Sequence, residues 1–215
     1  MSVGRVQSYE HDYASGYLWP VRDAQSGSVS LPKTGQEISY ATGDDGDLKK
    51  GATWPIPRFN DNGNGTVTDD LTSLMWTKDA NVPGPSNCNP GTYKTWQGLL
   101  DYIICLNDNN YLGYHDWRLP NRKELRSLID YSQYNKPALP SGHPFTNVQS
   151  NTYWSSTTYM PNTDFAWSLD MMDGYVGDSG KGIDYAGWPV RAGQSGSFGN
   201  LYVSPSSYDF GEQFL

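Results

Sequence analysis

Residues 153–191 read YWSSTTYMPNTDFAWSLDMMDGYVGDSGKGIDYAGWPVR, and this stretch decides the fold of the chain. Large core-type residues stand near both of its ends, Trp154 at the start and Trp188 at the finish. Between them, apolar residues alternate with aromatic or small polar residues. Such alternation is typical of strands that bury one face and expose the other. The stretch contains no catalytic arrangement and predicts a sheet with an exposed binding face.

The alternation is clearest around residues 167–172. Trp167, Leu169 and Met171 fall on one side of an extended strand and are expected in the core. The residues expected on the outer side are Ser168, Asp170 and Met172, together with Tyr159, Phe165, Tyr175 and Tyr185 from flanking positions. Exposed rings beside carboxylates favour a ligand-binding patch over an ordinary solvated sheet face. The flexible run at 178–182 is expected to be a loop.

Composition excludes several classes of partner. Among 215 residues, 15 Lys and Arg stand against 23 Asp and Glu, for a net charge of −8. This balance disfavours nucleic acid and anionic lipid surfaces. No apolar run approaches the roughly 20 residues that a membrane-spanning helix needs, and the first residues, MSVGRVQSYEHDY, do not read as a secretory signal. We expect no membrane insertion. These first residues leave open that the protein stays inside the cell, and the favoured location is a cell surface, the extracellular space or a virus particle.

Metal and thiol chemistry are poorly supported. His11, His115 and His143 are scattered, with no two at ligand spacing. Residues 61–69 carry oxygen donors at alternate positions, as calcium loops do, but glycines replace expected carboxylates, so a turn between strands is favoured. Cys88 and Cys105 allow either one disulfide, worth about 3 kcal/mol, or two free thiols. No metal, cofactor or catalytic residue is predicted.

The remaining elements follow from local signals. Two strands are expected within residues 57–81, and a helix over 96–106 with Thr95 as its N-cap. A second helix follows Pro120, with Asn121 and Glu124 forming a capping box and a buried stripe of Leu125, Leu128 and Ile129. Strands are expected at 152–157, 165–171 and 174–176, with a hairpin turn at Asp173-Gly174. Helices beside antiparallel strands predict an α+β fold.

The chain divides into three parts. Residues 1–53 are expected to be an N-terminal extension, 54–195 the main domain and 196–215 a tail. The string WPVR occurs at 19–22 and again at 188–191, so the extension is interpreted as the end of an upstream repeat or as a strand beside the C-terminal copy. The tail, with SPSSYDFG, resembles the first strand of an immunoglobulin-like domain.

A family resemblance rests on several motifs in order. These are RFNDNGNGTVTDDLTSLMWTKDAN, TWQGLLDYI, GYHDWRLPNRKELRSLIDYS, YWSSTT and WPVR. Together they resemble the DUF1566 family of bacterial and archaeal proteins, which is related to the C-terminal domain of a Legionella collagen-like adhesin. The resemblance covers about residues 54–195. It implies a C-type-lectin-like fold with two helices, small antiparallel or mixed sheets and long loops.

The C-terminal region also resembles the variable proteins of diversity-generating retroelements. Those proteins use lectin-like folds and concentrate variation on one C-terminal face, at codons that yield residues such as Asn, Asp, Tyr, Ser and Gly. Met160, Met171 and Met172 depart from that set. The resemblance and the strand alternation together give the ligand-binding candidates: Tyr159, Asn162, Phe165, Ser168, Asp170, Met172, Tyr175, Gly177, Asp178, Ser179, Ile183, Asp184, Tyr185 and Gly187.

Three functions are weighed. The favoured one is a display module that recognises a protein or cell-surface ligand through its C-terminal face. The second is a structural repeat of a surface protein without a specific ligand. The third is an oxidase similar to formylglycine-generating enzymes, which share a related fold but use a cysteine pair late in the chain. Both cysteines here precede residue 106, so we expect the protein not to be an enzyme.

Overall fold

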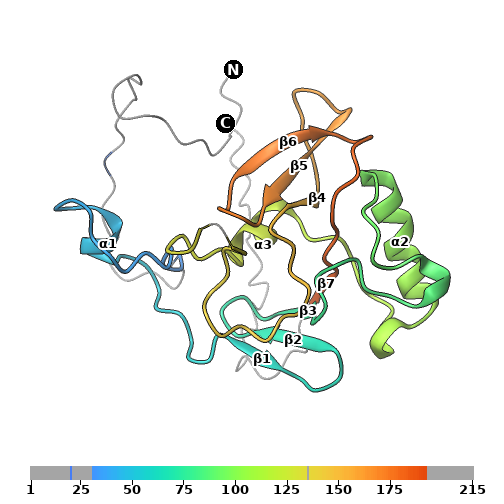
Figure 1. Ribbon diagram of the computed structural model, residues 1–215, viewed down its shortest axis with the longest axis horizontal. Helices are drawn as coiled ribbons and strands as arrows, with labels where there is room; N and C mark the ends of the chain where they lie inside the picture. The colour runs from blue at the N-terminus through green and yellow to red at the C-terminus, as the bar shows by residue number, and fades with distance from the viewer. Residues whose placement is uncertain (1–19, 21–30, 135, 193–215) are drawn as a thin grey trace, which may run out of the picture.

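Two small antiparallel sheets form the centre of the molecule, as Figure 1 shows for the computed structural model. The structure describes residues 20, 31–134 and 136–192. One sheet has the strand order β1-β2-β3-β7, and the other has the order β4-β5-β6. The strands are β1 (Phe59–Asp61), β2 (Thr66–Asp69), β3 (Leu74–Thr77), β4 (Thr152–Thr158), β5 (Phe165–Asp170), β6 (Val176–Gly180) and β7 (Val190–Ala192).

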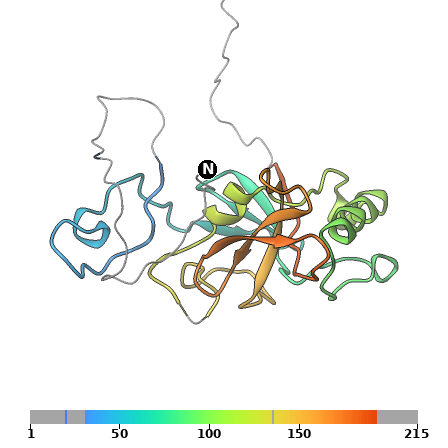
Figure 2. The same ribbon diagram turned by 90° about the horizontal axis from the view of Figure 1, so that it is seen from above.

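Helices flank these sheets, which confirms the α+β class. They are α1 (Asp45–Leu48), α2 (Trp96–Asp108) and α3 (Arg122–Ser127), with single 3-10 turns at η1 (Ser86–Cys88) and η2 (Tyr111–Gly113). Seen from above, α1 and α2 lie at opposite ends of the molecule, with the sheets between them (Figure 2). Within the described residues, no helix is both long and apolar enough to cross a membrane. The tail, for which the start of an immunoglobulin-like domain is expected, lies outside the described residues, as does all but Pro20 of the first WPVR copy.

Both principal helices begin where their caps predict. The Thr95 hydroxyl accepts a hydrogen bond from the Gly98 amide at the start of α2. At α3, the Asn121 side chain accepts from the amide of Glu124, whose own carboxylate accepts from the Asn121 amide, so the capping box is complete. The short helix α1 falls in the expected N-terminal extension, for which the sequence predicts no helix, and Asp44 caps it.

Residues 57–81 form three strands rather than the two expected. The β1–β2 turn uses Gly63 and Gly65, both at positive φ, which confirms a turn there. A second turn follows at Asp69, whose carboxylate accepts hydrogen bonds from the Leu71 amide and the Thr72 hydroxyl. Because this side chain bends the backbone before Leu74, the expected second strand is split into β2 and β3.

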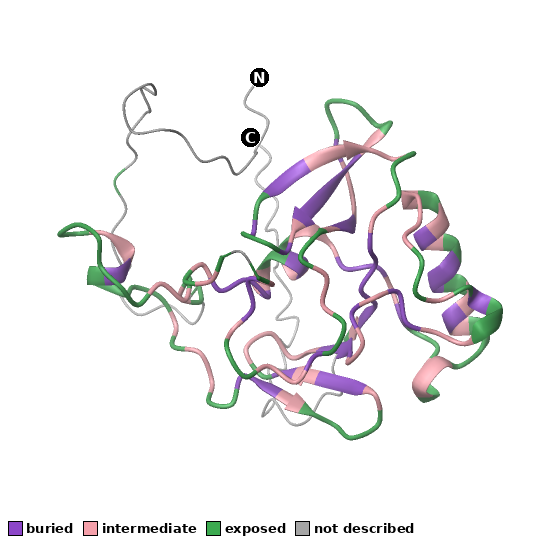
Figure 3. Cartoon of the chain, viewed as in Figure 1, coloured by how far each residue is buried: buried purple, intermediate pink, exposed green. Residues whose placement is uncertain are grey.

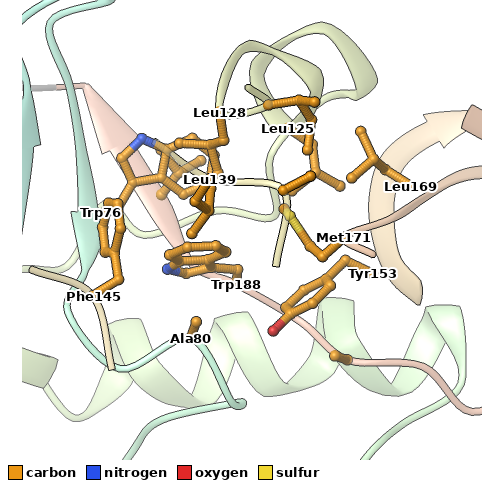
Figure 4. Packing of buried hydrophobic residues seen from close by; sticks show 14 of the residues in the cluster. Trp76, Ala80, Leu125, Leu128, Leu139, Phe145, Tyr153, Leu169, Met171 and Trp188 are labelled. Atoms are coloured by element: carbon orange, nitrogen blue, oxygen red, sulfur yellow. The ribbon is translucent and has the colours of Figure 1, made fainter. Parts of the chain in front are cut away.

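The main core lies between the two sheets and α3. Trp188 is its centre, with its ring centroid 5.5 Å from that of Trp76, 4.8 Å from Phe145 and 5.9 Å from Tyr153. Figure 4 shows these rings beside Leu125, Leu128, Leu139, Leu169 and Met171. The Trp188 indole nitrogen donates to the Thr77 carbonyl at 2.9 Å, so the ring is buried with its polar atom satisfied. Trp167, Leu169 and Met171 are all buried, as their alternation predicts.

A second core lies under α2. It includes Leu99, Ile103, Trp117 and Trp154, and it covers one end of the outer face of the β4-β5-β6 sheet. Cys88 of η1 is joined to Cys105 of α2 by a disulfide, which settles the alternative that the sequence left open. Figure 3 shows the buried residues of this region on the α2 side that faces the sheets.

The β5–β6 hairpin turns at Asp173-Gly174, as expected, and Gly174 takes a φ of +78°. The strand that follows is longer and later than expected, because β6 runs from Val176 to Gly180. Residues 178–180 are therefore paired with β5 and are not part of a loop. This correction places Ser179 on a rigid element.

Candidate functional site

A pocket of about 310 Å³ opens on the outer face of the β4-β5-β6 sheet, beyond the part that α2 covers. Strand pairing accounts for its position. Thr152 stands opposite Asp170, and Ser168 stands opposite Gly177, so these side chains share one face. The lining residues are Thr152, Ser168, Asp170, Tyr175, Gly177, Asp178, Ser179 and Tyr185. All except Thr152 are among the residues that the sequence singles out.

The floor of this pocket carries hydroxyl groups. The Ser168 hydroxyl lies 3.5 Å from the Gly177 carbonyl and 3.5 Å from Ser179 Oγ, and Ser179 Oγ lies 3.2 Å from the Tyr185 hydroxyl. Hydroxyl hydrogen bonds normally measure about 2.5–3.0 Å. Ser168 is only 5% exposed, so its hydroxyl is buried on the floor with long contacts to protein acceptors. It retains capacity for a further partner.

Tyr185 lines the pocket and is held by its ring and its backbone. Its ring centroid lies 4.9 Å from that of Trp154, and its backbone exchanges two hydrogen bonds with Lys94, each 3.0 Å long. The Lys94 ammonium donates hydrogen bonds to the Asn89 carbonyl and the Thr92 hydroxyl. Desolvation lowers the pKa of Lys94, and the nearby Asp184 carboxylate opposes that shift. This lysine is not among the residues that line the pocket.

Tyr175 and Asp170 line the pocket at the β5–β6 turn. Tyr175 is 43% exposed, and its amide donates to the Asp173 carboxylate at 2.8 Å. Asp170 Oδ1 accepts from the Met172 amide at 2.9 Å. Among the ion pairs of the described residues, none includes Asp170. The pocket therefore presents a half-buried carboxylate without a cationic partner.

Asp178 and Asp170 are assigned to opposite faces of the sheet. Asp178 lines the pocket, but its pairing opposite Trp167 assigns its side chain to the core side of the sheet by alternation. The electrostatic character of the pocket therefore depends mainly on Asp170. The lining contains neither Lys nor Arg.

Three expected display residues were wrongly assigned. Tyr159 is 8% exposed and packs edge-to-face on Trp167, with ring centroids 5.2 Å apart. A register shift in the β4–β5 ladder lies between Trp154 and Thr158, just before Tyr159, so the alternation of β4 does not carry this ring to the outer face. Phe165 is half-buried against the main core. Gly187 is buried. A Cβ at this position would lie 2.5 Å from the Leu99 side chain of α2, so close packing against the helix requires a glycine here.

Other candidates are exposed but lie outside the pocket lining. They are Asn162 at the β4–β5 turn, Met172 at the β5–β6 turn, and Ile183 and Asp184 after β6. Sequence reasoning missed Thr152, which pairs opposite Asp170. Its place two residues before Trp154 on the same strand is the signal that predicts a shared face.

A larger hollow of about 430 Å³ lies away from the display residues, between segment 33–59 and segment 130–143. Trp54, Phe59 and His143 are among the residues that line it, and burial lowers the pKa of His143. Arg58, one of the basic residues in this lining, forms a two-bonded ion pair with Asp69 through Nε and Nη2 and lies 4.7 Å and 4.6 Å from the Trp54 and Phe59 rings. Its Nη1 is buried without a hydrogen-bond partner. No sequence signal pointed to this hollow.

The described residues contain no group of three or more His, Cys, Asp or Glu side chains placed to hold a metal ion. What the smaller pocket offers is recognition chemistry: its lining holds two tyrosines, three serine or threonine hydroxyls and two aspartates, of which Asp170 lies on the outer face of the sheet. Fold and pocket thus define an α+β domain with a polar, aromatic hollow on its C-terminal sheet.

Comparison with known families agrees with the motifs. The model of the Lcl C-terminal domain matches residues 65–191, which is more than half of the chain, and the chain belongs to this family. A search of curated proteins finds no match. The matched region contains β2 to β6, α2, α3 and the whole pocket lining, so the candidate site lies within the family domain.

Proposed function

We propose that this chain is a ligand-binding display module of a surface protein, with a C-type-lectin-like fold, that recognises an extracellular protein through the pocket on the β4-β5-β6 sheet. The observation that carries the proposal is the convergence of Ser168, Asp170, Tyr175, Ser179 and Tyr185 on one hollow. Tyrosine rings offer large contact area with few torsions to fix, which suits recognition.

The scaffold supports this function because it separates stability from recognition. The core rings around Trp188 lie on the inner side of the sheet, whereas Ser168 and Asp170 alternate to the outer side. A partly exposed outer residue such as Asp170 is expected to tolerate change without loss of the fold. The Cys88–Cys105 disulfide favours an oxidising location, such as a cell surface, the extracellular space or a virus particle.

An array of purified extracellular proteins tests the proposal. We expect the full chain to bind particular members, and Tyr175→Ala to reduce that binding at least tenfold. The matched control is Tyr134→Ala, which removes an exposed tyrosine that is 72% accessible and lies outside the pocket. If no member binds, or if both variants bind as the unchanged chain does, the proposal fails.

Diversification by a retroelement is part of the same proposal, and population sequencing of the gene tests it. We expect substitutions to concentrate at codons 168, 170, 175, 179 and 185, beside a template repeat and a reverse transcriptase gene. Substitutions spread evenly over the chain would instead favour the structural-repeat function. That alternative draws its support from the repeated WPVR string.

A further inference from the structure

Asp170 is the most informative charged group in the pocket. Its carboxylate is half-buried, accepts one backbone hydrogen bond from Met172, and belongs to no ion pair among the described residues. A carboxylate removed from water gains most from a cationic partner that replaces the lost hydration. In this structure that cation is not supplied by the residues that line the pocket.

Two tyrosines line the same hollow as Asp170. Tyr175 immediately precedes β6, and Tyr185 lies in the segment that follows it. The faces of aromatic rings attract guanidinium and ammonium groups. Ser168, with its buried hydroxyl and contacts of 3.5 Å, adds an acceptor on the floor. Rings, carboxylate and hydroxyl together form a cation-binding set.

From this geometry we infer that the pocket takes a basic side chain, an arginine or lysine presented by the partner protein. The inference rests on the proposed function and adds the chemistry of the ligand group. The net charge of −8 favours a basic partner surface over an acidic one. A sulfated or other anionic group would face the Asp170 carboxylate without a compensating Lys or Arg in the lining. A volume of about 310 Å³ suits one side chain rather than a folded element.

The experiment titrates the full chain, labelled with nitrogen-15, with N-acetyl-arginine methylamide while amide resonances are followed. The comparison probe is N-acetyl-citrulline methylamide, which has nearly the same shape but no charge. We expect shifts at Tyr175, Gly177, Ser179 and Tyr185, with affinity for the arginine probe at least tenfold above that for citrulline. A third titration uses methyl α-glucopyranoside, for which we expect no shift at these residues.

Two variants distinguish the effect of the Asp170 charge on arginine affinity from the effect of the net charge of the chain. Asp170→Asn should lower arginine affinity at least tenfold, which removes the preference over citrulline. The control Asp101→Asn changes the net charge equally at an exposed position of α2 and should leave the affinity unchanged. A preserved amide spectrum in both variants shows that the fold is intact.

Several results would overturn the inference: equal affinity for arginine and citrulline, binding of the glucoside alone, or no shift at pocket residues with any probe. Its failure is distinguishable from failure of the proposed function. If array partners lose binding to Tyr175→Ala but the arginine probe does not bind, the display function stands and the basic-ligand inference is wrong. If the arginine probe binds as expected but no array partner depends on Tyr175, the pocket has the inferred chemistry and the proposed display function is wrong.

Discussion

The Tyr185 hydroxyl lies 3.2 Å from Ser179 Oγ, which ties the loop after β6 to the strand face that it covers. The ring of the same residue lies tilted against the ring of Trp154, and its backbone pairs with that of Lys94. Fixed at these points, the wall of the pocket is shaped before any ligand arrives. Preorganisation of this kind reduces the entropy that binding must overcome.

Tyr185→Phe tests that relationship. It removes the hydroxyl contact and keeps the ring on Trp154, so we expect the free energy of unfolding to fall by about 1 kcal/mol. Urea denaturation followed by tryptophan fluorescence measures the change. A loss above about 3 kcal/mol would mean that the hydroxyl supports the core and not merely the pocket wall.

Tyr159→Ala and Tyr175→Ala should differ sharply in stability. Tyr159 is buried against Trp167, so its truncation should cost about 3–5 kcal/mol. Tyr175 is 43% exposed, and its truncation should change the free energy by about 0.5 kcal/mol. Thermal melts of the two variants give the comparison. Equal losses would contradict the assignment of one ring to the core and the other to the pocket.

The disulfide between Cys88 and Cys105 should contribute about 3 kcal/mol through the loop that it closes. We expect the Cys88→Ser and Cys105→Ser double variant to unfold at correspondingly lower urea concentration. Reduction of the unchanged chain by dithiothreitol provides the control, because it should produce the same shift. A double variant as stable as the oxidised chain would show that the crosslink adds nothing to stability.

The ion pair of Arg58 and Asp69 is buried, with the two side chains 4% and 0% exposed. Asp69→Asn leaves a buried guanidinium without its counter-charge, so a loss of about 3–5 kcal/mol is expected. Asp61→Asn provides the comparison, since Asp61 pairs with Lys78 at the surface, with both side chains 35% exposed. Chemical denaturation of that variant should show a loss below about 1 kcal/mol. Similar losses in both variants would contradict the account.

Local signals in the sequence predicted much of the fold. The caps at Thr95 and Asn121, the stripe on α3 and the turn at Gly174 depend on neighbouring residues alone, so pattern reasoning finds them. The split between β2 and β3 depends on hydrogen bonds that the Asp69 carboxylate accepts from Leu71 and Thr72. An aspartate at this position does not by itself predict these two bonds.

The candidate site was predictable where strand alternation held. Ser168 and Asp170 follow it along β5, whereas Tyr159 lies beyond a register shift that no single-sequence pattern reports. Gly187 was wrongly assigned because its closeness to Leu99 arises only when α2 packs on the sheet. Tertiary packing, and not local propensity, decided these cases.

The most direct test of the central claim is hydrogen–deuterium exchange of the full chain, free and bound to a partner found on the array. Our account predicts slowed exchange in β5, β6 and the loop that carries Tyr185, with little change around Trp54 and His143. Protection confined to the hollow near Trp54 and His143, with none over residues 168–185, would contradict it.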